Sequence, residues 1–117
     1  MAASDDSIVE YALETLAEIG EVKPRKMFGG VGIYGDGVMF ALVKDAALYF
    51  KTAGSNVDDY EAAGSKPFEV DMRGKVTRMA YHEVPADVLD NGDRMREWAL
   101  RSMAVALEAK KPAKSGG

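Results

Sequence analysis

The stretch that decides the fold is MFGGVGIYGDGVMFALV, residues 27–43. Within it, Gly30 to Gly35 match the pattern G-x-G-x-x-G, whose glycines in a dinucleotide-binding loop follow a strand and open a helix. In this chain they follow a helical segment, and the residues after them, VMFALV, are strand formers. Asp36-Gly37 is a strong signal of a two-residue hairpin turn, because both residue types tolerate positive φ. The stretch therefore predicts a β-hairpin, and no nucleotide cofactor is expected.

The glycines of this hairpin need another explanation, because glycine weakens a strand and is usually kept where a bulge or a close backbone contact requires it. We expect Gly30 and Gly32 to let the first or the last helix pack close to the sheet. Gly29 is expected to supply a bulge where the strand begins. The structural motif proposed from this stretch has seven residues: Met27, Phe28, Gly29, Gly30, Gly32, Asp36 and Gly37.

The turn also predicts a register for the two strands. With Asp36-Gly37 as the turn, Ile33 lies opposite Phe40 and Val31 opposite Leu42, so that large apolar pairs share one face. Tyr49 of the next strand is expected on the Phe40 face, and Leu48 on the Ala41 face. The opposite face of the hairpin would carry Gly30, Gly32, Tyr34, Met39, Ala41 and Val43.

Outside this stretch, apolar residues recur at helical spacing in some segments and alternate in others. Helices are predicted over residues 4–19, from Ser55 or Asn56 to Gly64, in a short turn after Pro85, and from a cap at Asp93 to about Ala109. Further strands are predicted over residues 47–51, 66–72 and 75–84, the last two joined by a turn at Arg73-Gly74.

This order of elements predicts an α+β fold. Its antiparallel sheet would have about five strands, a three-stranded meander plus a hairpin, packed with N-terminal, middle and C-terminal helices. Residues 1–109 are expected to form one domain. Residues 110–117, KKPAKSGG, are expected to form a disordered tail, because they are too polar to pack.

The composition sets limits on function. The chain of 117 residues has a net charge of −4, and without Lys110, Lys111 and Lys114 it has 12 basic against 19 acidic residues, a net charge of −7. A domain with this negative charge repels polyanions such as nucleic acid. The absence of cysteine excludes disulfides, thiolate zinc sites and a cysteine nucleophile. With acids at the N-terminus where a signal peptide has bases, a cytoplasmic location without membrane contact is expected.

No catalytic, metal or cofactor site is predicted. His82 is the single histidine, and its neighbour Glu83 points to the other face of a strand, so a packing or surface role is expected. Ser102 is expected to bond back to the preceding turn of its own helix. The acids Asp58, Asp59 and Glu61 suit the start of a helix. Six strand aromatics are assigned mainly to core packing: Phe28, Tyr34, Phe40, Tyr49, Phe50 and Tyr81.

Basic residues gather in two places, one before the first predicted strand and one around the second hairpin turn. If the two groups met in space, they would form one positive patch on an acidic body. The residues of this candidate basic patch are Lys23, Arg25, Lys26, Arg73, Lys75 and Arg78.

Several ordered segments carry a family resemblance: RKMFGGVGIYGDGVMFALV, LYFK, GSKPFEV, MAYHEVP and EWA. Together, over about residues 8–106, they resemble the N-terminal domain of the TfoX (Sxy) family of bacterial competence regulators. The resemblance implies a cytoplasmic α+β domain linked to transcription, in a family whose full-length members act as coactivators with the cyclic-AMP receptor protein. Those members carry a second, C-terminal domain that resembles helix-hairpin-helix DNA binders, whereas this chain is expected to be a stand-alone copy of the first. The family offers no established catalytic residues.

The favoured hypothesis is a non-enzymatic regulatory or interaction module that acts through a protein partner, as a transcriptional coactivator does. Two alternatives stay open. One is a small-ligand binding protein or enzyme that uses the glycine-rich face of the sheet, and it predicts a cavity with converging polar groups. The other is weak, salt-sensitive DNA binding through the basic turns.

Overall fold

Asp36 and Gly37 form the turn that the sequence predicts. In the computed structural model, which describes residues 5–27 and 29–110, they have φ angles of 51° and 80° and join strands β2 (Gly30–Gly35) and β3 (Val38–Lys44). The two strands pair antiparallel. Because the glycines lie within a strand and before a hairpin turn, the stretch does not have the geometry of a dinucleotide-binding loop.

The predicted register of this hairpin is wrong, because β3 contains a bulge. Tyr34 pairs with Met39, but Ile33 pairs with Ala41, so Phe40 is an extra residue with no partner on β2. In such a bulge two residues of one strand face one residue of the other, which disturbs the alternation. Phe40 and Ala41 are therefore both buried on the same side as Ile33, and Leu42 lies on the opposite face.

The described residues form a sheet of six antiparallel strands, in the order β1-β2-β3-β4-β6-β5. The α+β prediction is confirmed, with one strand more than expected. The additional strand is β1 (Val22–Met27), which pairs with β2 at one edge of the sheet. β1 was not predicted from the sequence, because it contains Pro24 and three basic residues. An edge strand tolerates both proline and charge. The other strands are β4 (Ala47–Lys51), β5 (Pro67–Met72) and β6 (Lys75–Glu83).

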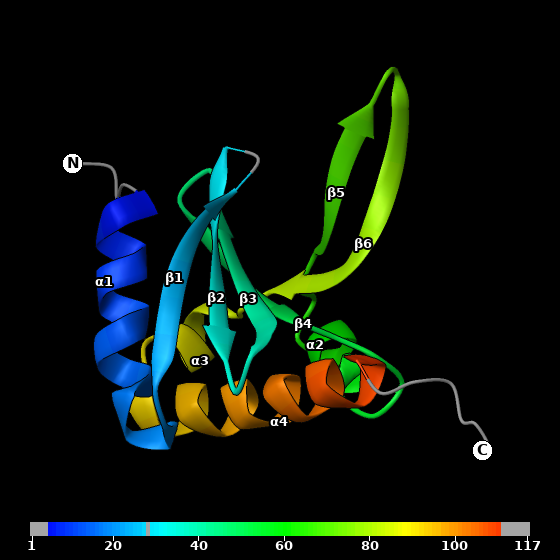
Figure 1. The fold of residues 1–117 in the computed structure, drawn as a ribbon. Helices are drawn as coiled ribbons and strands as arrows, with labels where there is room; N and C mark the ends of the chain where they lie inside the picture. The colour runs from blue at the N-terminus through cyan, green and yellow to red at the C-terminus, as the bar shows by residue number, and fades with distance from the viewer. Residues whose placement is uncertain (1–4, 28, 111–117) are drawn as a thin grey trace, which may run out of the picture.

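The helices cover one face of this sheet, as Figure 1 shows. They are α1 (Asp5–Leu16), which continues as a 3₁₀ turn over Ala17–Ile19, α2 (Val57–Ala62), α3 (Ala86–Leu89) and α4 (Gly92–Lys110). The cap of α4 is Asn91 rather than the predicted Asp93, because the Asn91 Oδ1 accepts a hydrogen bond from the Arg94 backbone N–H at 3.1 Å. No helix among the described residues is long and apolar enough to cross a lipid bilayer.

The core lies between the helices and the central strands. The residues of the last helix that recur at helical spacing on one side are all buried: Met95, Trp98, Ala99, Ser102, Met103 and Ala106. They pack against β2, β3 and β4 and against α1, whose buried residues are Val9, Ala12 and Leu16. Phe28 and most of the predicted tail, residues 111–117, lie outside the described residues.

Strands β5 and β6 form a hairpin that extends beyond the helical layer and flanks the helix-free face of the sheet (Figure 1). Its turn is the predicted Arg73-Gly74, with φ angles of 56° and 84°. β6 also pairs with β4, which joins the hairpin to the meander. Val76 and Met79 are exposed on this hairpin.

Candidate functional site

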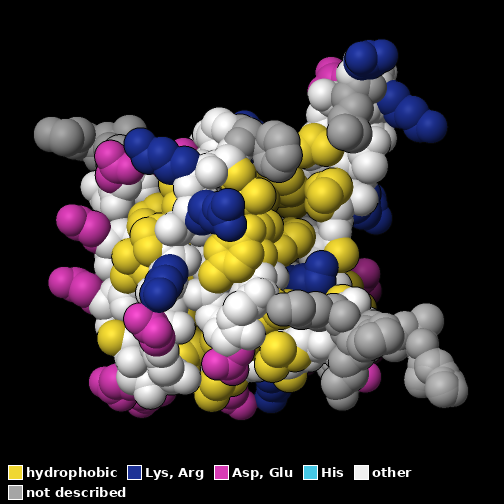
Figure 2. Space-filling view, viewed as in Figure 1, with side chains coloured by type: hydrophobic (Ala, Val, Ile, Leu, Met, Phe, Trp, Pro, Cys, Tyr) yellow, Lys and Arg dark blue, Asp and Glu magenta, His cyan; other side chains and the backbone are white. Residues whose placement is uncertain are grey.

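The helix-free face of the sheet carries a second, smaller apolar cluster. Leu42, Phe68 and Tyr81 are buried there, with Met39 and Tyr49 packed against them. The rings of Tyr49 and Phe68 meet edge to face, with centroids 4.9 Å apart. Since no described helix covers this face, the cluster borders solvent, and yellow apolar atoms occupy the middle of the face in Figure 2.

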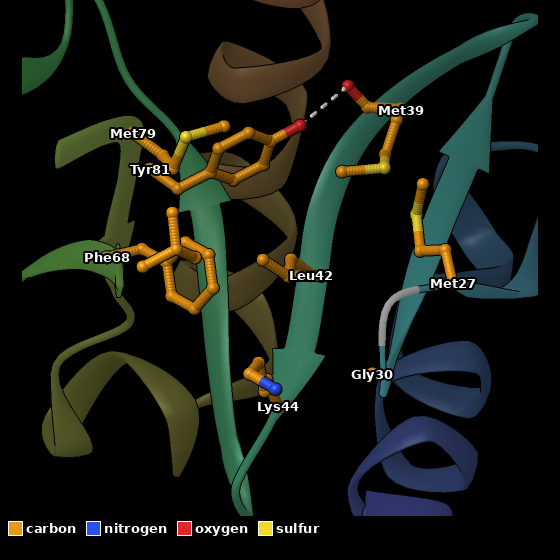
Figure 3. A pocket seen from close by; sticks show the side chains of 9 residues that line it. Met27, Gly30, Met39, Leu42, Lys44, Phe68, Met79 and Tyr81 are labelled. Carbon is orange, nitrogen blue, oxygen red and sulfur yellow. Dashed lines mark hydrogen bonds between the residues drawn. The ribbon is translucent and has the colours of Figure 1, made fainter. Parts of the chain in front are cut away.

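This cluster forms the floor and one wall of a hollow of about 380 Å³. Figure 3 shows Phe68, Met79 and Tyr81 on one side and Met27 and Met39 on the other. The residues that line the hollow, called the apolar groove below, are Met27, Gly30, Met39, Leu42, Lys44, Phe68, Val70, Met79 and Tyr81.

Two side chains bring polar atoms to the apolar groove. The Tyr81 hydroxyl is already used, because it donates to the Met39 carbonyl at 3.3 Å. Burial raises the pKa of Tyr81 to about 12, so the phenol stays neutral at physiological pH. Lys44 lies at one end of the groove (Figure 3). These groups do not converge on one point as an acid–base pair would, so the groove suits binding by apolar contact.

Two glycines of the motif, Gly30 and Gly32, belong to this face, and no helix of the described residues packs on them. A Cβ atom on Gly32 would lie 2.6 Å from the Met39 sulfur and 2.8 Å from the Met27 sulfur. A Cβ atom on Gly30 would lie 2.6 Å from the backbone oxygen of Val43 on the neighbouring strand. The expectation that helices approach these glycines is therefore wrong. Their lack of side chains makes room for methionine thioethers and for the backbone of β3.

Gly29 and Gly35 also differ from the sequence interpretation. Gly29 lies in the turn before β2, with a φ of 77° that favours glycine, instead of forming a strand bulge. Gly35, which was not part of the predicted motif, is the glycine that faces a helix. A Cβ atom there would lie 2.6 Å from Met103 Cε of α4 and 3.2 Å from the Phe40 ring.

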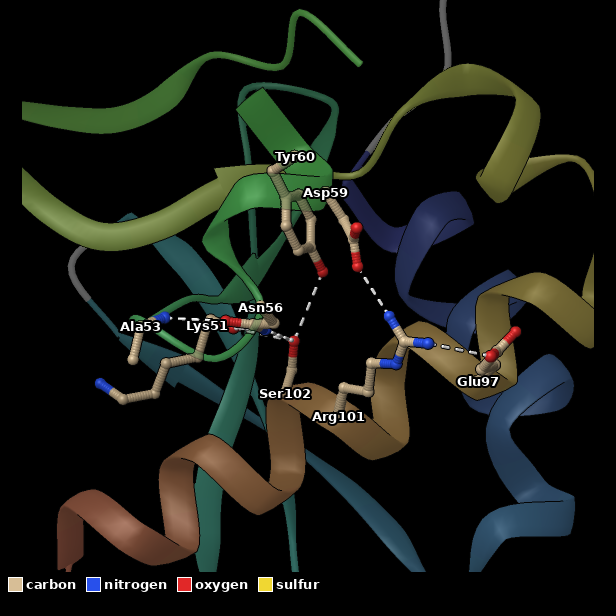
Figure 4. A network of polar contacts seen from close by, with 8 residues as sticks. All are labelled: Lys51, Ala53, Asn56, Asp59, Tyr60, Glu97, Arg101 and Ser102. Atoms are coloured by element: carbon tan, nitrogen blue, oxygen red, sulfur yellow. Dashed lines mark hydrogen bonds and ion pairs between the residues drawn. The ribbon is translucent and has the colours of Figure 1, made fainter. Parts of the chain in front are cut away.

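On the helical side, a buried polar network connects the end of β4 to α2 and α4 (Figure 4). Ser102 donates to the Lys51 carbonyl at 2.8 Å, and the Asn56 side-chain amide donates to the same carbonyl at 3.0 Å. The Tyr60 hydroxyl lies 3.4 Å from Ser102 Oγ, and burial raises the pKa of Tyr60 to about 12. The prediction that Ser102 bonds back to its own helix is therefore wrong, because its hydroxyl donates to a strand. The network supplies hydrogen-bond donors to the Lys51 carbonyl at the buried end of β4, and its role is structural.

The predicted acids lie on the surface of α2. Asp58 and Asp59 occupy its first turn, where carboxylates complement the helix dipole. Arg101 on α4 donates to Asp59 at 2.7 Å and to Glu97 at 3.1 Å (Figure 4). Among the described residues, no cluster of three or more His, Asp or Glu is placed to hold a metal ion.

The two groups of bases lie on strands at opposite edges of the sheet. Lys23, Arg25 and Lys26 belong to β1, whereas Arg73 lies in the turn between β5 and β6, and Lys75 and Arg78 belong to β6. The strand order thus separates the two halves of the candidate basic patch. Lys23 lies 3.7 Å from Glu21, and Arg78 lies 3.8 Å from Glu69, so each group also has an acidic neighbour.

His82 packs inside the protein. It is 8% exposed, its Nδ1 lies 2.9 Å from Thr52 Oγ1, and its ring lies 5.8 Å from that of Tyr60. Burial lowers the pKa of His82 below the ordinary value of 6.5, and this outweighs the opposing effect of Glu61. The neutral imidazole is the form that fits the fold.

We therefore expect the stability of the protein to fall as the pH falls below about 6.5, where the unfolded chain takes up a proton that folded His82 resists. The contribution is fully present above the unfolded pKa and is lost as the pH approaches the lower folded pKa. Melting temperatures at about pH 7.5 and about pH 5.5 test this. The His82→Gln variant should lose less stability over that interval than the wild type, and an equal loss in both would contradict the assignment.

The sequence did not predict that the residues of the apolar groove come together in one site. Met39, Leu42 and Phe68 come from different hairpins, and the bulge at Phe40 moves Leu42 to a face where strict alternation does not place it. One signal was present in β6, where the large apolar residues Met79 and Tyr81 stand two apart, with Ala80 between them. It becomes informative only once the strand order puts β6 beside β4.

Comparison with known proteins agrees with this architecture. The family model of the TfoX N-terminal domain matches residues 14–106. A curated relative, the DNA transformation protein TfoX1 of Aliivibrio fischeri (strain ATCC 700601 / ES114), is 31% identical over 67 residues. The match covers 57% of this chain and 32% of that protein, so the chain corresponds to about a third of the relative's length.

Proposed function

We propose that this chain, which belongs to the TfoX N-terminal domain family, is a non-enzymatic regulatory domain that acts by binding a protein partner in the apolar groove. The observation that carries the proposal is the lining of the groove, which is apolar apart from Lys44 and the already bonded Tyr81 hydroxyl. The curated relative is named a DNA transformation protein. This name supports a role in the regulation of transformation, which the domain would exert through a transcriptional partner.

The chemistry of the groove favours a protein partner. Met27, Met39 and Met79 line it, and methionine side chains adapt to differently shaped apolar partners because they are flexible and polarisable. Contiguous apolar surface on a folded domain is characteristic of interaction sites. Met79 is 41% exposed at the rim, where a partner would cover it.

A small apolar ligand is the second candidate, because a volume of about 380 Å³ lies within the range of small-molecule sites, roughly 300–1,000 Å³. Such sites usually add a few placed polar groups that fix the ligand. Among the described residues, Lys44 is the one lining side chain with a polar group free of a hydrogen bond, which favours the protein partner. Direct DNA binding has less support, since the basic groups lie on opposite edges of the sheet.

The test is site-specific photo-crosslinking in the cells from which the chain comes. A photoreactive phenylalanine analogue at Met79 should give a discrete adduct with a protein, identified by mass spectrometry. The same analogue at Leu100, which is 49% exposed on the outer side of α4, serves as the matched control and should give none. Adducts of equal yield at both positions, or none at Met79, would contradict the proposal.

A further inference from the structure

Basic residues lie on the same face of the sheet as the apolar groove, and Lys44 lines it. Residues that pair directly in an antiparallel sheet project to the same face. Lys23 pairs with Tyr34 and Arg25 with Gly32, so both project from β1 to the helix-free face. On β3 and β4 the same face carries the alternating residues Leu42 and Lys44, and Tyr49 and Lys51. The basic ring, as it is called below, consists of Lys23, Arg25, Lys44 and Lys51.

Members of this ring are available for a partner. Arg25 and Lys44 form no ion pair within residues 5–27 and 29–110. Lys51 holds its ammonium 5.2 Å from the centre of the Tyr81 ring, which places positive charge directly above a wall of the groove. Lys23 has one exposed contact, with Glu21 at 3.7 Å, which contributes little in water.

Acidic residues border this face at a few places. Asp5 and Asp6 of α1 share a surface hollow with Met27 and Gly30 at the edge of the groove, and Asp6 and Glu10 share another hollow with Arg25. Burial is the main cause that raises the pKa of Tyr49, and both Glu83, which pairs with Tyr49, and Asp45 raise it further. Figure 2 shows blue basic side chains among and around the yellow apolar surface, with magenta acids gathered at its margins. A protein with a net charge of −4 thus places four basic side chains on the face that carries the apolar groove.

We infer that the apolar groove and the basic ring together bind an acidic amphipathic segment of the partner protein. Apolar side chains of that segment fill the groove, and its Asp and Glu carboxylates meet the basic ring. This inference rests on the proposed function and adds the chemistry of the partner. Charge complementarity speeds encounter and selects among partners, while the apolar contacts supply most of the affinity.

Other occupants fit the same surface less well. A nucleic acid brings a dense row of phosphates, which the overall negative charge repels. The two rings that line the groove, Phe68 and Tyr81, are buried and so are not free for base stacking. The C-terminal segment KKPAKSGG of this chain carries the same charge sign as the ring. A short segment with a few carboxylates satisfies both the apolar and the basic parts.

Fluorescence anisotropy with three labelled synthetic peptides tests the inference. The first has leucine and phenylalanine at helical spacing with glutamate between them, the second has lysine in place of glutamate, and the third keeps the glutamates but has serine at the apolar positions. The full chain should bind the first peptide at least about tenfold more tightly than either of the others, and raising the salt concentration should weaken that binding. Equal binding of the first two peptides would overturn the inference.

Variants locate the binding site. Arg25→Glu and Lys51→Glu should each weaken binding of the acidic peptide on the order of fivefold, the size expected for an exposed ion pair. Arg78→Glu is the matched control, since Arg78 projects from the other face of β6 beside Glu69, and it should leave the affinity unchanged. Circular dichroism establishes that each variant is folded. Equal loss in all three variants would show a general charge effect and overturn the inference.

The outcomes separate this inference from the proposed function. A protein adduct at Met79 together with no preference for the acidic peptide leaves the proposed function standing and overturns the inference. A labelled single-stranded oligonucleotide that binds more tightly than the acidic peptide, and loses affinity in Arg25→Glu and Lys51→Glu, would assign the surface to nucleic acid and overturn both.

Discussion

Replacing Gly30 with alanine is expected to destabilise the fold by about 2–3 kcal/mol, although the change adds a single methyl group. The new Cβ would lie 2.6 Å from the Val43 carbonyl oxygen and 3.3 Å from Lys44 Cβ. A carbonyl oxygen in the middle of a sheet cannot move aside without shifting its strand. Gly30 itself has no positive φ, so the cost is steric rather than conformational. Urea-induced unfolding of the two proteins measures the difference in free energy.

Gly32→Ala is the matched control for this prediction. Its added Cβ would meet two sulfur atoms, those of Met39 at 2.6 Å and Met27 at 2.8 Å, which lie far out on flexible side chains. These side chains can rotate away, so we expect a loss below about 1 kcal/mol. A Gly32 variant as unstable as the Gly30 variant would show that the methionines are held rigidly. A Gly30 variant of wild-type stability would refute the close approach to β3.

Replacing Phe40 with alanine is expected to destabilise the protein by about 3–5 kcal/mol, which for a domain of this size leaves little stability. Phe40 is 0% exposed, its ring centre lies 6.2 Å from that of Phe50, and it packs beside Gly35 under α4. Truncation would remove the ring and leave a cavity at the bulge. Thermal and urea unfolding followed by circular dichroism measure the loss.

The control for Phe40→Ala is Val76→Ala on the hairpin formed by β5 and β6. Val76 is 62% exposed, so its truncation should change the stability by no more than about 0.5 kcal/mol. If Phe40→Ala were equally mild, the core would have to collapse around the bulge and fill the space. That result would contradict the packing described for β3 and α4.

Local signals were sufficient for most of the elements. Asp36-Gly37 and Arg73-Gly74 make the two predicted hairpin turns, since positive φ at adjacent positions is a property of a few residues only. The apolar stripe of α4 follows from a spacing that brings residues three and four apart to one face. Strand β1 escaped prediction because its sequence, VKPRKM, has no apolar alternation, and pairing with β2 supplies its stability.

The candidate site was less predictable than the fold. The motif included Met27, Gly30 and Gly32, and its glycines Gly30 and Gly32 were assigned to helix packing, because the sequence does not tell which face of a strand the helices cover. Two of the bases, Lys44 and Lys51, were not recognised as site residues at all. They join Lys23 and Arg25 only because four strands lie side by side in a definite register.

The sequence by itself determined the α+β class, the turns, the helices and the family, because these depend on residues that are neighbours along the chain. Tertiary structure decided the bulge at Phe40, the edge strand β1 and the groove between β3 and the last hairpin. Each of these depends on a contact between distant segments, and a single extra residue in β3 reverses which side chains face the helices. Alternation along a strand defines two faces, but only packing chooses the one that is buried.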